Sequence, residues 1–306
     1  MGDKNMKHKY KFAILGGDMR QYAVARAICE NKNISVCVSA LCRECTDDII
    51  IKECSEIYDA VTGADAVVLP LPVSTDGVCL NCPAYLEKQR ITLDEIIEKM
   101  EEKSILFGGR IPQSTTVKAQ ARGIRVYDYF LCEDLQIKNA YITAEAAVSI
   151  AMNSLDKCLR GAAVAVTGTG RISRLLCELL VKLGGKVTVA GRNADALAYF
   201  EIMGCKTLVI DNAEGWSGEL EHGYDIIFNT VPAWIFDRNF LERADKKLTV
   251  IELASAPGGV DICAARELGT NVLWASSLPG KYAPHSAGIL IGECVCQAFE
   301  KMEVRV

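Results

Sequence analysis

A glycine turn between an apolar run and a helical pattern carries the most specific chemistry in this sequence. Residues 163–173 are Ala-Val-Ala-Val-Thr-Gly-Thr-Gly-Arg-Ile-Ser. In a Gly-x-Gly-x-x-Gly turn, the first glycine permits the tight bend, the second lets a pyrophosphate approach the backbone, and the third keeps helix and strand close. Gly168 and Gly170 fit this pattern, and Ser173 departs from it. Because the N–H groups that open a helix attract anions, the turn predicts a dinucleotide site.

The residues after the next expected strand indicate which dinucleotide binds. An NAD site usually has Asp or Glu there, to bind the ribose hydroxyls. This chain has Arg192, whose planar guanidinium suits the 2′-phosphate of NADP. We therefore expect NADP, with NAD as the alternative, and a later strand end to meet the nicotinamide. The expected cofactor contacts are Gly168, Thr169, Gly170, Arg171, Ile172, Arg192, Asn193, Thr230, Val231 and Pro232.

Charged and polar loops after other expected strands predict a site for a small anion. Arg20, Arg110 and Lys281 would supply the positive charge that a polyanionic substrate needs. Asp18 and His285 are the two candidates for accepting a proton near neutral pH. The expected substrate contacts are Arg20, Gln21, Ser74, Thr75, Arg110 and Lys281.

The sequence has 14 cysteines, which raises the question of a metal. Cys42 with Cys45 and Cys79 with Cys82 form two C-x-x-C pairs, the spacing of zinc ligands. The stretch between the pairs exceeds the usual ribbon spacing of about 15–20 residues. We expect no metal and leave zinc as the alternative. The chain starts without the apolar core of a signal peptide, so we expect reduced thiols in the cytoplasm.

Strand and helix patterns alternate along the chain, which is typical of an α/β fold with parallel sheets. The length of 306 residues suits two domains. We predict two doubly wound parallel-sheet domains, the first a flavodoxin-like or Rossmann-like substrate domain over 1–140. The second, over 141–306, is predicted to be a Rossmann NAD(P)-binding domain. A crossover helix over 143–159 opens it, and its C-terminal helix packs back.

Composition and charge exclude several other classes of protein. Half of the residues are hydrophobic and 24% are charged, as in ordinary globular proteins. A net charge of −5 argues against a nucleic-acid-binding surface. No run reaches the ~18 apolar residues that a membrane helix needs, so no membrane partner is expected.

Four segments in matching order resemble the family of the dipicolinate synthase A subunit. They are Gly16-Gly-Asp-x-Arg-Gln21, Thr143-Ala-Glu-Ala-Ala147, Val166-Thr-Gly-Thr-Gly-Arg171 and Ser277-Leu-Pro-Gly-Lys-x-Ala-Pro284. The resemblance implies oxidation of a dihydrodipicolinate-level intermediate of the lysine pathway to dipicolinate (pyridine-2,6-dicarboxylate), with NAD(P) accepting the hydride. It also implies a dicarboxylate substrate, the flavoprotein-like B subunit of dipicolinate synthase as partner, and the mother cell of a sporulating bacterium as the location. We expect a homo-oligomer.

Two other functions remain open. Residues 283–288, Ala-Pro-His-Ser-Ala-Gly, resemble the catalytic-histidine loop of D-2-hydroxy-acid dehydrogenases. That family also needs an arginine just after its fifth strand, where this chain has Ala-Ser-Ala-Pro at 254–257. The chain would alternatively be a non-catalytic NADP-binding protein whose partner holds the reactive site.

Overall fold

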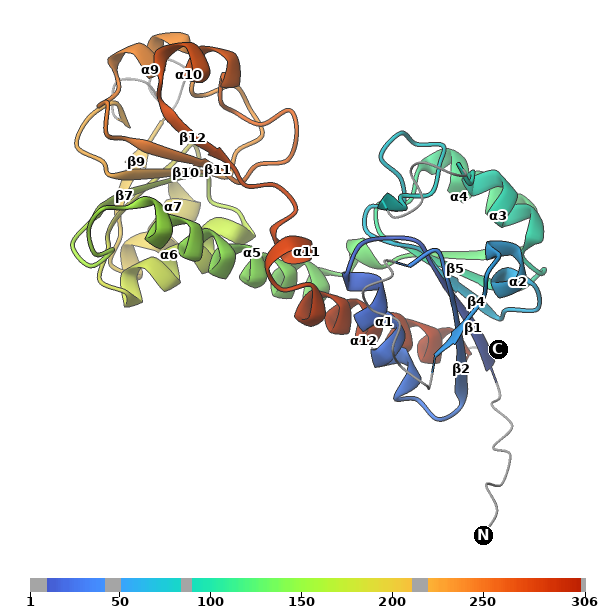
Figure 1. The fold of residues 1–306 in the computed structure, drawn as a ribbon. Helices are drawn as coiled ribbons and strands as arrows, with labels where there is room; N and C mark the ends of the chain where they lie inside the picture. Colours follow the sequence, from blue (N-terminus) through green and yellow to red (C-terminus); the bar gives the residue numbers. More distant parts are fainter. Residues whose placement is uncertain (1–9, 42–50, 84–89, 211–219, 304–306) are drawn as a thin grey trace. The chain divides into compact units, whose positions relative to one another are not determined.

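The chain folds into two compact units (Figure 1). The structure is a computed structural model that describes residues 10–41, 51–83, 90–210 and 220–303. Unit 1 contains the chain through Lys138 and again from Ala283 onward, and unit 2 is Asn139–Tyr282. The predicted division at residue 140 lies beside Lys138. The C-terminal helix, which we assigned to the residue range of the second domain, is part of unit 1.

Unit 1 is built on a six-stranded parallel sheet in the order β3-β2-β1-β4-β5-β6. The strands are β1 (Tyr10–Leu15), β2 (Ile34–Ser39), β3 (Lys52–Glu53), β4 (Ala66–Val68), β5 (Ile105–Gly108) and β6 (Arg125–Asp128). The helices are α1 (Arg20–Cys29), α2 (Ile57–Val61), α3 (Leu93–Lys99), α4 (Gln113–Ala121), the 3-10 turn η3 (Tyr129–Leu131) and α12 (Pro284–Glu303). The strand order reverses between β1 and β4, so loops at that carboxyl edge are placed to bind a ligand.

Helices cover both faces of this sheet, which explains why its central strands β1, β4 and β5 are largely apolar. On β1, Phe12 and Ile14 point into a core that they share with α1 and α12. Ala13 and Leu15 point into a second core, which they share with α2, α3 and α4. The central strand β1 is therefore buried on both of its faces.

Helix α12 approaches α1 closely, and Figure 1 shows the two side by side. A Cβ atom added at Gly288 would lie 2.3 Å from the carbonyl oxygen of Arg20 and 2.6 Å from the Cβ of Ala23. One added at Gly292 would lie 2.6 Å from the Cβ of Ala27. Both glycines are needed for space, because only hydrogen fits between the two backbones.

Unit 2 has a second six-stranded parallel sheet, in the order β12-β11-β10-β7-β8-β9. The strands are β7 (Ala163–Thr167), β8 (Lys186–Gly191), β9 (Lys206–Val209), β10 (Ile226–Asn229), β11 (Thr249–Glu252) and β12 (Asn271–Trp274). The helices are α5 (Glu133–Ser154), which begins in unit 1, α6 (Arg171–Lys182), α7 (Ala194–Ile202), α9 (Arg238–Arg243), α10 (Ile262–Leu268) and α11 (Leu278–Tyr282). This is the Rossmann strand order, with its switch point between β7 and β10. The predicted fold class of two α/β parallel-sheet domains is confirmed.

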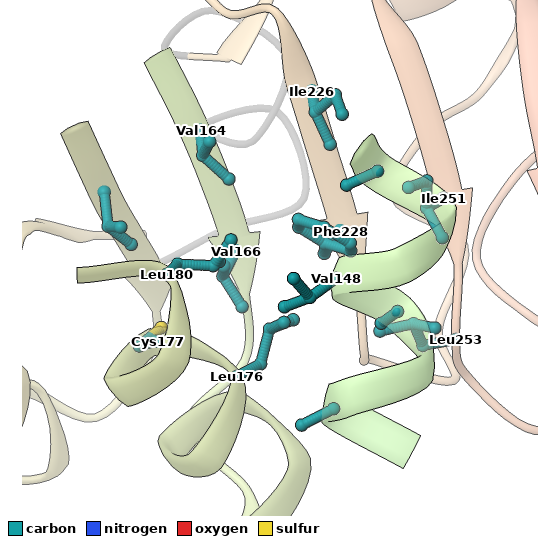
Figure 2. Close-up of a cluster of buried hydrophobic side chains, with 14 of the residues drawn as sticks. Val148, Val164, Val166, Leu176, Cys177, Leu180, Ile226, Phe228, Ile251 and Leu253 are labelled. Carbon is teal, nitrogen blue, oxygen red and sulfur yellow. The ribbon is translucent and has the colours of Figure 1, made fainter. Parts of the chain in front are cut away.

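One core of unit 2 lies between its sheet and helices α5 and α6, as Figure 2 shows. Val148 of α5 and Leu176 of α6 meet Val166 of β7 and Phe228 of β10 there, and the last three side chains of this set are fully buried. Helices α9 and α10 belong to a separate core on the other face. The central strands β7 and β10 are thus held from both sides, and so are the loops at their ends.

Several elements differ from the prediction. The crossover helix was predicted over 143–159, but α5 begins at Glu133 and ends at Ser154. Its first turn lies before the predicted start and contains Glu133 and Asp134. Acidic side chains stabilise a helix there, because the N-terminal end of the helix dipole is positive. Lys281 and His285, which we expected on loops, lie on α11 and in the first turn of α12. Among the described residues, no helix is both long and apolar enough to span a bilayer.

Candidate functional site

The glycine turn of unit 2 lies at the switch point of its sheet, between β7 and α6 (Figure 1). Gly168 has φ +93°, a conformation that favours glycine. A Cβ added there would lie 2.6 Å from the Oγ1 of Thr230, whereas one added at Gly170 would meet nothing within 4 Å. Gly170 precedes α6 and has no side chain to cap it. The turn leaves open space at a helix N-terminus, which fits a pyrophosphate.

Ser173 replaces the third glycine of the motif without opening the turn. Its side chain is fully buried, and its Oγ lies 2.9 Å from the Oγ1 of Thr230. Thr230 in turn donates to the carbonyl oxygen of Thr167, at 2.7 Å. A small hydroxyl therefore keeps α6 close to the ends of β7 and β10, which is the work of a small third residue in this motif.

Arg192 and Asn193 follow β8, on the other side of β7 from β10. Arg192 is exposed, and no ion pair to it is found among the described residues. Asn193 caps α7 by accepting a hydrogen bond from the N–H of Ala196, at 3.0 Å. Gly191 lies against the turn, since an added Cβ would approach the Thr169 side chain to 2.9 Å. Arg192 is thus free to contact a ligand, whereas the carbonyl oxygen of the Asn193 side chain is engaged.

A buried polar cluster that the sequence did not reveal lies at the ends of β10 and β11. Asn229 and Glu252, the last residues of these strands, are fully buried. The Nδ2 of Asn229 lies 2.9 Å from both carboxylate oxygens of Glu252. The N–H groups of Ala254 and Gly259 donate to the same carboxylate, at 2.8 and 2.9 Å. Polar residues closing two otherwise apolar strands were the available signal for this cluster.

The first unit brings together Asp18 and Arg20 at the start of α1. The Arg20 Nε donates to the Oδ1 of Asp18, and its Nη2 to Oδ2, both at 2.8 Å. Nη2 also donates to the carbonyl oxygen of Leu71, at 2.5 Å. Arg20 is buried, so this pair is a bidentate internal contact rather than two free side chains. Among the described residues, no hydrogen bond donated by its Nη1 is found.

Gln21 and Tyr129 are buried residues of unit 1 whose side chains donate hydrogen bonds to backbone carbonyl oxygens. Gln21 is buried and donates from Nε2 to the carbonyl oxygen of Leu15, at 3.1 Å. The hydroxyl of Tyr129, also fully buried, donates to the carbonyl oxygen of Leu69. Burial raises the pKa of Tyr129 far above its usual range. The Gln21 amide therefore fixes the ends of strands, and its predicted substrate contact would require it to leave a buried position.

The loop after β4 contains Ser74 and Thr75, two predicted substrate contacts. Ser74 donates to the carboxylate of Asp76 and accepts from the N–H of Gly77. Hydrogen bonds from the N–H groups of Cys79 and Val78, and from Ser74, hold the pKa of Asp76 well below its usual range. Ser74 thus shapes the loop, and Thr75 is exposed at its tip.

Arg110 follows β5 in a strained position that exposes its side chain. Its φ is +58°, unusual for a residue with a side chain. Its N–H donates to Asp128 at 3.1 Å, and its guanidinium lies 4.9 Å from the ring centroid of Phe130. The carboxyl edge of the unit 1 sheet thus holds an exposed cation supported by an aromatic ring.

His285 and Lys281 fall in different units. His285 is exposed in the first turn of α12, one turn before Gly288, which packs against the backbone of Arg20. His285 therefore belongs to the same end of unit 1 as Asp18 and Arg20. Lys281 is exposed on α11 and belongs to unit 2.

The cysteines that the structure describes are free thiols, and most of them are at least partly buried. A hydrogen bond with Cys205, together with burial, raises the pKa of the Cys177 thiol. Burial and the neighbouring Cys132 raise the pKa of Cys294 to about 12. No cluster of three or more metal-ligating side chains occurs within the described ranges. Cys42 and Cys45 lie outside those ranges, so the zinc alternative is not tested.

Comparison with known proteins confirms the resemblance found in the sequence. Residues 11–130 match the family model described as the N-terminal domain of the dipicolinate synthase A subunit. The A subunit of dipicolinate synthase from Bacillus subtilis (strain 168) is 25% identical over 307 residues, covering 96% of this chain and 97% of that protein. The crystal structure of the dipicolinate synthase A subunit from Bacillus halodurans has a TM-score of 0.81 and 26% identity, covering 97% of this chain and 99% of that one.

More distant structures share the fold alone. A transhydrogenase from Sinorhizobium meliloti has a TM-score of 0.66 at 13% identity, covering 95% of this chain and 94% of that one. The fold of parallel sheets covered by helices is therefore one that this transhydrogenase also has.

Proposed function

We propose that the chain oxidises a dihydrodipicolinate-level intermediate to dipicolinate with a nicotinamide cofactor, because it resembles the A subunit of dipicolinate synthase from end to end. The observation that carries the proposal is the Gly168–Gly170 turn at the β7/β10 switch point, with open space before the N-terminus of α6. Unit 2 is then the cofactor-binding unit, and unit 1 holds the proposed substrate contacts other than Lys281.

NADP is the proposed cofactor, with NAD as the alternative. When bound, it accepts a hydride from the substrate. The turn residues Gly168, Thr169 and Gly170 would hold its pyrophosphate, with Arg171 and Ile172 opening α6 beneath it. Arg192 is proposed to bind the 2′-phosphate, because it is exposed and follows Gly191, which lies against the turn. Thr230, Val231 and Pro232 would line the opposite half of the site.

The substrate is a small dicarboxylate, so it needs cationic anchors. Arg20 can offer its Nη1, since its Nε and Nη2 already donate to Asp18 and Leu71. Arg110 and Lys281 are exposed and are proposed as the further anchors. The predicted contacts of Ser74, Gln21 and Asn193 remain proposals that compete with the internal hydrogen bonds of these side chains.

Oxidation removes two hydrogens from the dihydropyridine ring. One leaves as a hydride to the cofactor and the other as a proton, and the ring becomes aromatic. Of the two candidate bases, His285 is the better placed, because it is exposed and both oxygens of Asp18 already accept N–H groups of Arg20. Asp18 then holds Arg20 in position. Aromatisation provides driving force, so a modest base suffices.

The resemblance also supports proposals about the setting. The flavoprotein-like B subunit of dipicolinate synthase is the proposed partner, the chain is proposed to form a homo-oligomer, and the cytoplasm of the mother cell is the proposed location. A D-2-hydroxy-acid dehydrogenase is the weaker alternative. The end of β11 has the buried Glu252 and then Leu253-Ala-Ser255, with no arginine to bind a 2-keto acid.

The test supplies the purified chain with NADP⁺ and enzymatically generated dihydrodipicolinate and follows the ultraviolet absorbance of the pyridine product. Product from the chain alone supports catalysis by this protein. Product only after addition of the partner supports a shared site or a non-catalytic role. No product in either case, with turnover of a 2-keto acid by NADPH, would favour the dehydrogenase alternative.

A further inference from the structure

The buried carboxylate of Glu252 has no cation beside it among the residues that the structure describes. It accepts from Asn229, Ala254 and Gly259, all of them neutral groups. A buried carboxylate is usually paired with a positive charge, because burial of an isolated charge is costly. Glu221, another buried glutamate of unit 2, is paired in this way with Arg243.

Burial raises the pKa of the Glu252 carboxyl, whereas the hydrogen bonds from Asn229, Gly259 and Ala254 act in the opposite direction and fit its charged form. Each of its two oxygens accepts from Asn229 and from one backbone N–H, and no acceptor for a carboxyl proton is found within the described ranges. An ionised carboxylate only accepts, whereas a protonated one needs a partner for its O–H. The Glu252 carboxylate is therefore an unpaired negative charge at the end of β11 in unit 2.

The strand order locates this charge relative to a dinucleotide. Arg192 follows β8 on one side of the Gly168 turn, whereas Asn229 and Glu252 end β10 and β11 on the other side. A dinucleotide lies across the switch point, so its two halves fall on opposite sides of β7. With the 2′-phosphate at Arg192, the nicotinamide half is left for the side of β10 and β11.

The same hydrogen bonds connect Glu252 to the loop that contacts the glycine turn. The side chain of Asn229 accepts from the N–H of Val231 and donates to its carbonyl oxygen, both at 3.1 Å. A Cβ added at Gly168 would meet Val231 at 2.9 Å. Thr167, at the end of β7, donates to the Oδ1 of Asn229. Only Asn229 and one loop residue therefore separate the charge from the turn.

We propose that Glu252 is a specificity-determining residue whose charge makes the site bind oxidised nicotinamide cofactor more tightly than reduced cofactor. The inference rests on the proposed function. The oxidised nicotinamide ring is a cation and the reduced ring is neutral, while the rest of the molecule is the same. A buried carboxylate on the nicotinamide side attracts the oxidised ring and not the reduced ring. Such a site binds the oxidised cofactor, which accepts a hydride, and releases the reduced cofactor that the hydride transfer produces.

The test measures dissociation constants for NADP⁺ and NADPH, without substrate, for the full chain and for Glu252→Gln. The unmutated chain should bind NADP⁺ at least about threefold more tightly, and E252Q should lower this preference by about fivefold, or ~1 kcal/mol. Glu221→Gln is the matched control, because it removes a buried charge of the same unit that lies before β10 rather than after it. Thr167→Val breaks the hydrogen bond to Asn229 and keeps the charge. Both controls should keep the preference within about twofold.

The outcomes separate the two proposals. Failure of the unmutated chain to bind NADP or NAD in either oxidation state overturns the proposed function and the inference with it. Binding with NADPH equal to or tighter than NADP⁺ overturns the inference alone, and this measurement does not depend on a variant that folds. An equal loss of affinity for NADP⁺ and NADPH in E252Q would mean that Glu252 has a structural role only.

Discussion

At the scale of single residues, what matters is which polar groups are still available to a ligand. Asp18, Arg20, Gln21 and Ser74 all make internal hydrogen bonds, although their positions after strands suggested contact with substrate. Arg192 differs, because it is exposed beside the glycine turn. A sequence places such residues at strand ends, but their partners depend on loops that meet only in the folded unit.

Arg192 is expected to determine which cofactor binds. Arg192→Ala should raise the Kd for NADP⁺ about tenfold, since it removes charge-assisted hydrogen bonds to the 2′-phosphate worth ~1.4 kcal/mol. The Kd for NAD⁺ should change less than about twofold. Isothermal titration calorimetry measures both. Arg266→Ala, at an exposed arginine in the last turn of α10, is the matched control and should change neither. An equal loss for both nucleotides would exclude 2′-phosphate recognition by Arg192.

At the scale of elements, the close approach of α12 and α1 makes a strong prediction. Gly288→Ala should lower the free energy of unfolding of unit 1 by about 1–3 kcal/mol, because the new Cβ meets the carbonyl oxygen of Arg20. This loss occurs although alanine in an exposed helix is favoured over glycine by about 1 kcal/mol. Urea unfolding measures it, with Gln297→Ala, at an exposed site of α12, as the control. Unchanged stability in G288A would mean that the helices have room to separate.

Most elements could be predicted from the sequence because period and composition are local properties. The apolar runs predicted β7 and β10, the helical pattern predicted α6, and the glycine spacing predicted the turn at Gly168. The start of α5 was missed because its first turns are polar, and α11 because it contains Pro279 and Gly280. The cluster of Asn229 and Glu252 was missed because two short strands, well separated in sequence, build it. Which residues of neighbouring strands lie side by side depends on the tertiary structure, and the periodicity of the sequence does not show it.

At the scale of the whole molecule, each unit has its own sheet and its own cores. We therefore expect two unfolding transitions in calorimetry. NADP⁺ at 100 times its Kd should stabilise only the transition of unit 2, by about 2.7 kcal/mol. Gly288→Ala should shift only the other transition, which assigns each one to its unit. A single transition that NADP⁺ shifts as a whole would show that the two units unfold together.

The path of the chain has a consequence for synthesis on the ribosome. Unit 2 is an insertion, and the last helix of unit 1 is made only after the whole of unit 2 has been translated. Until then Phe12 of β1 lacks Phe299, whose ring centroid lies 4.8 Å from its own in the finished protein, and the α12 side of that core is bare. Unit 2 can complete its fold while it emerges, whereas unit 1 must wait until α12 has been made. A nascent chain that stalls before α12 would expose this apolar surface to chaperones and proteases.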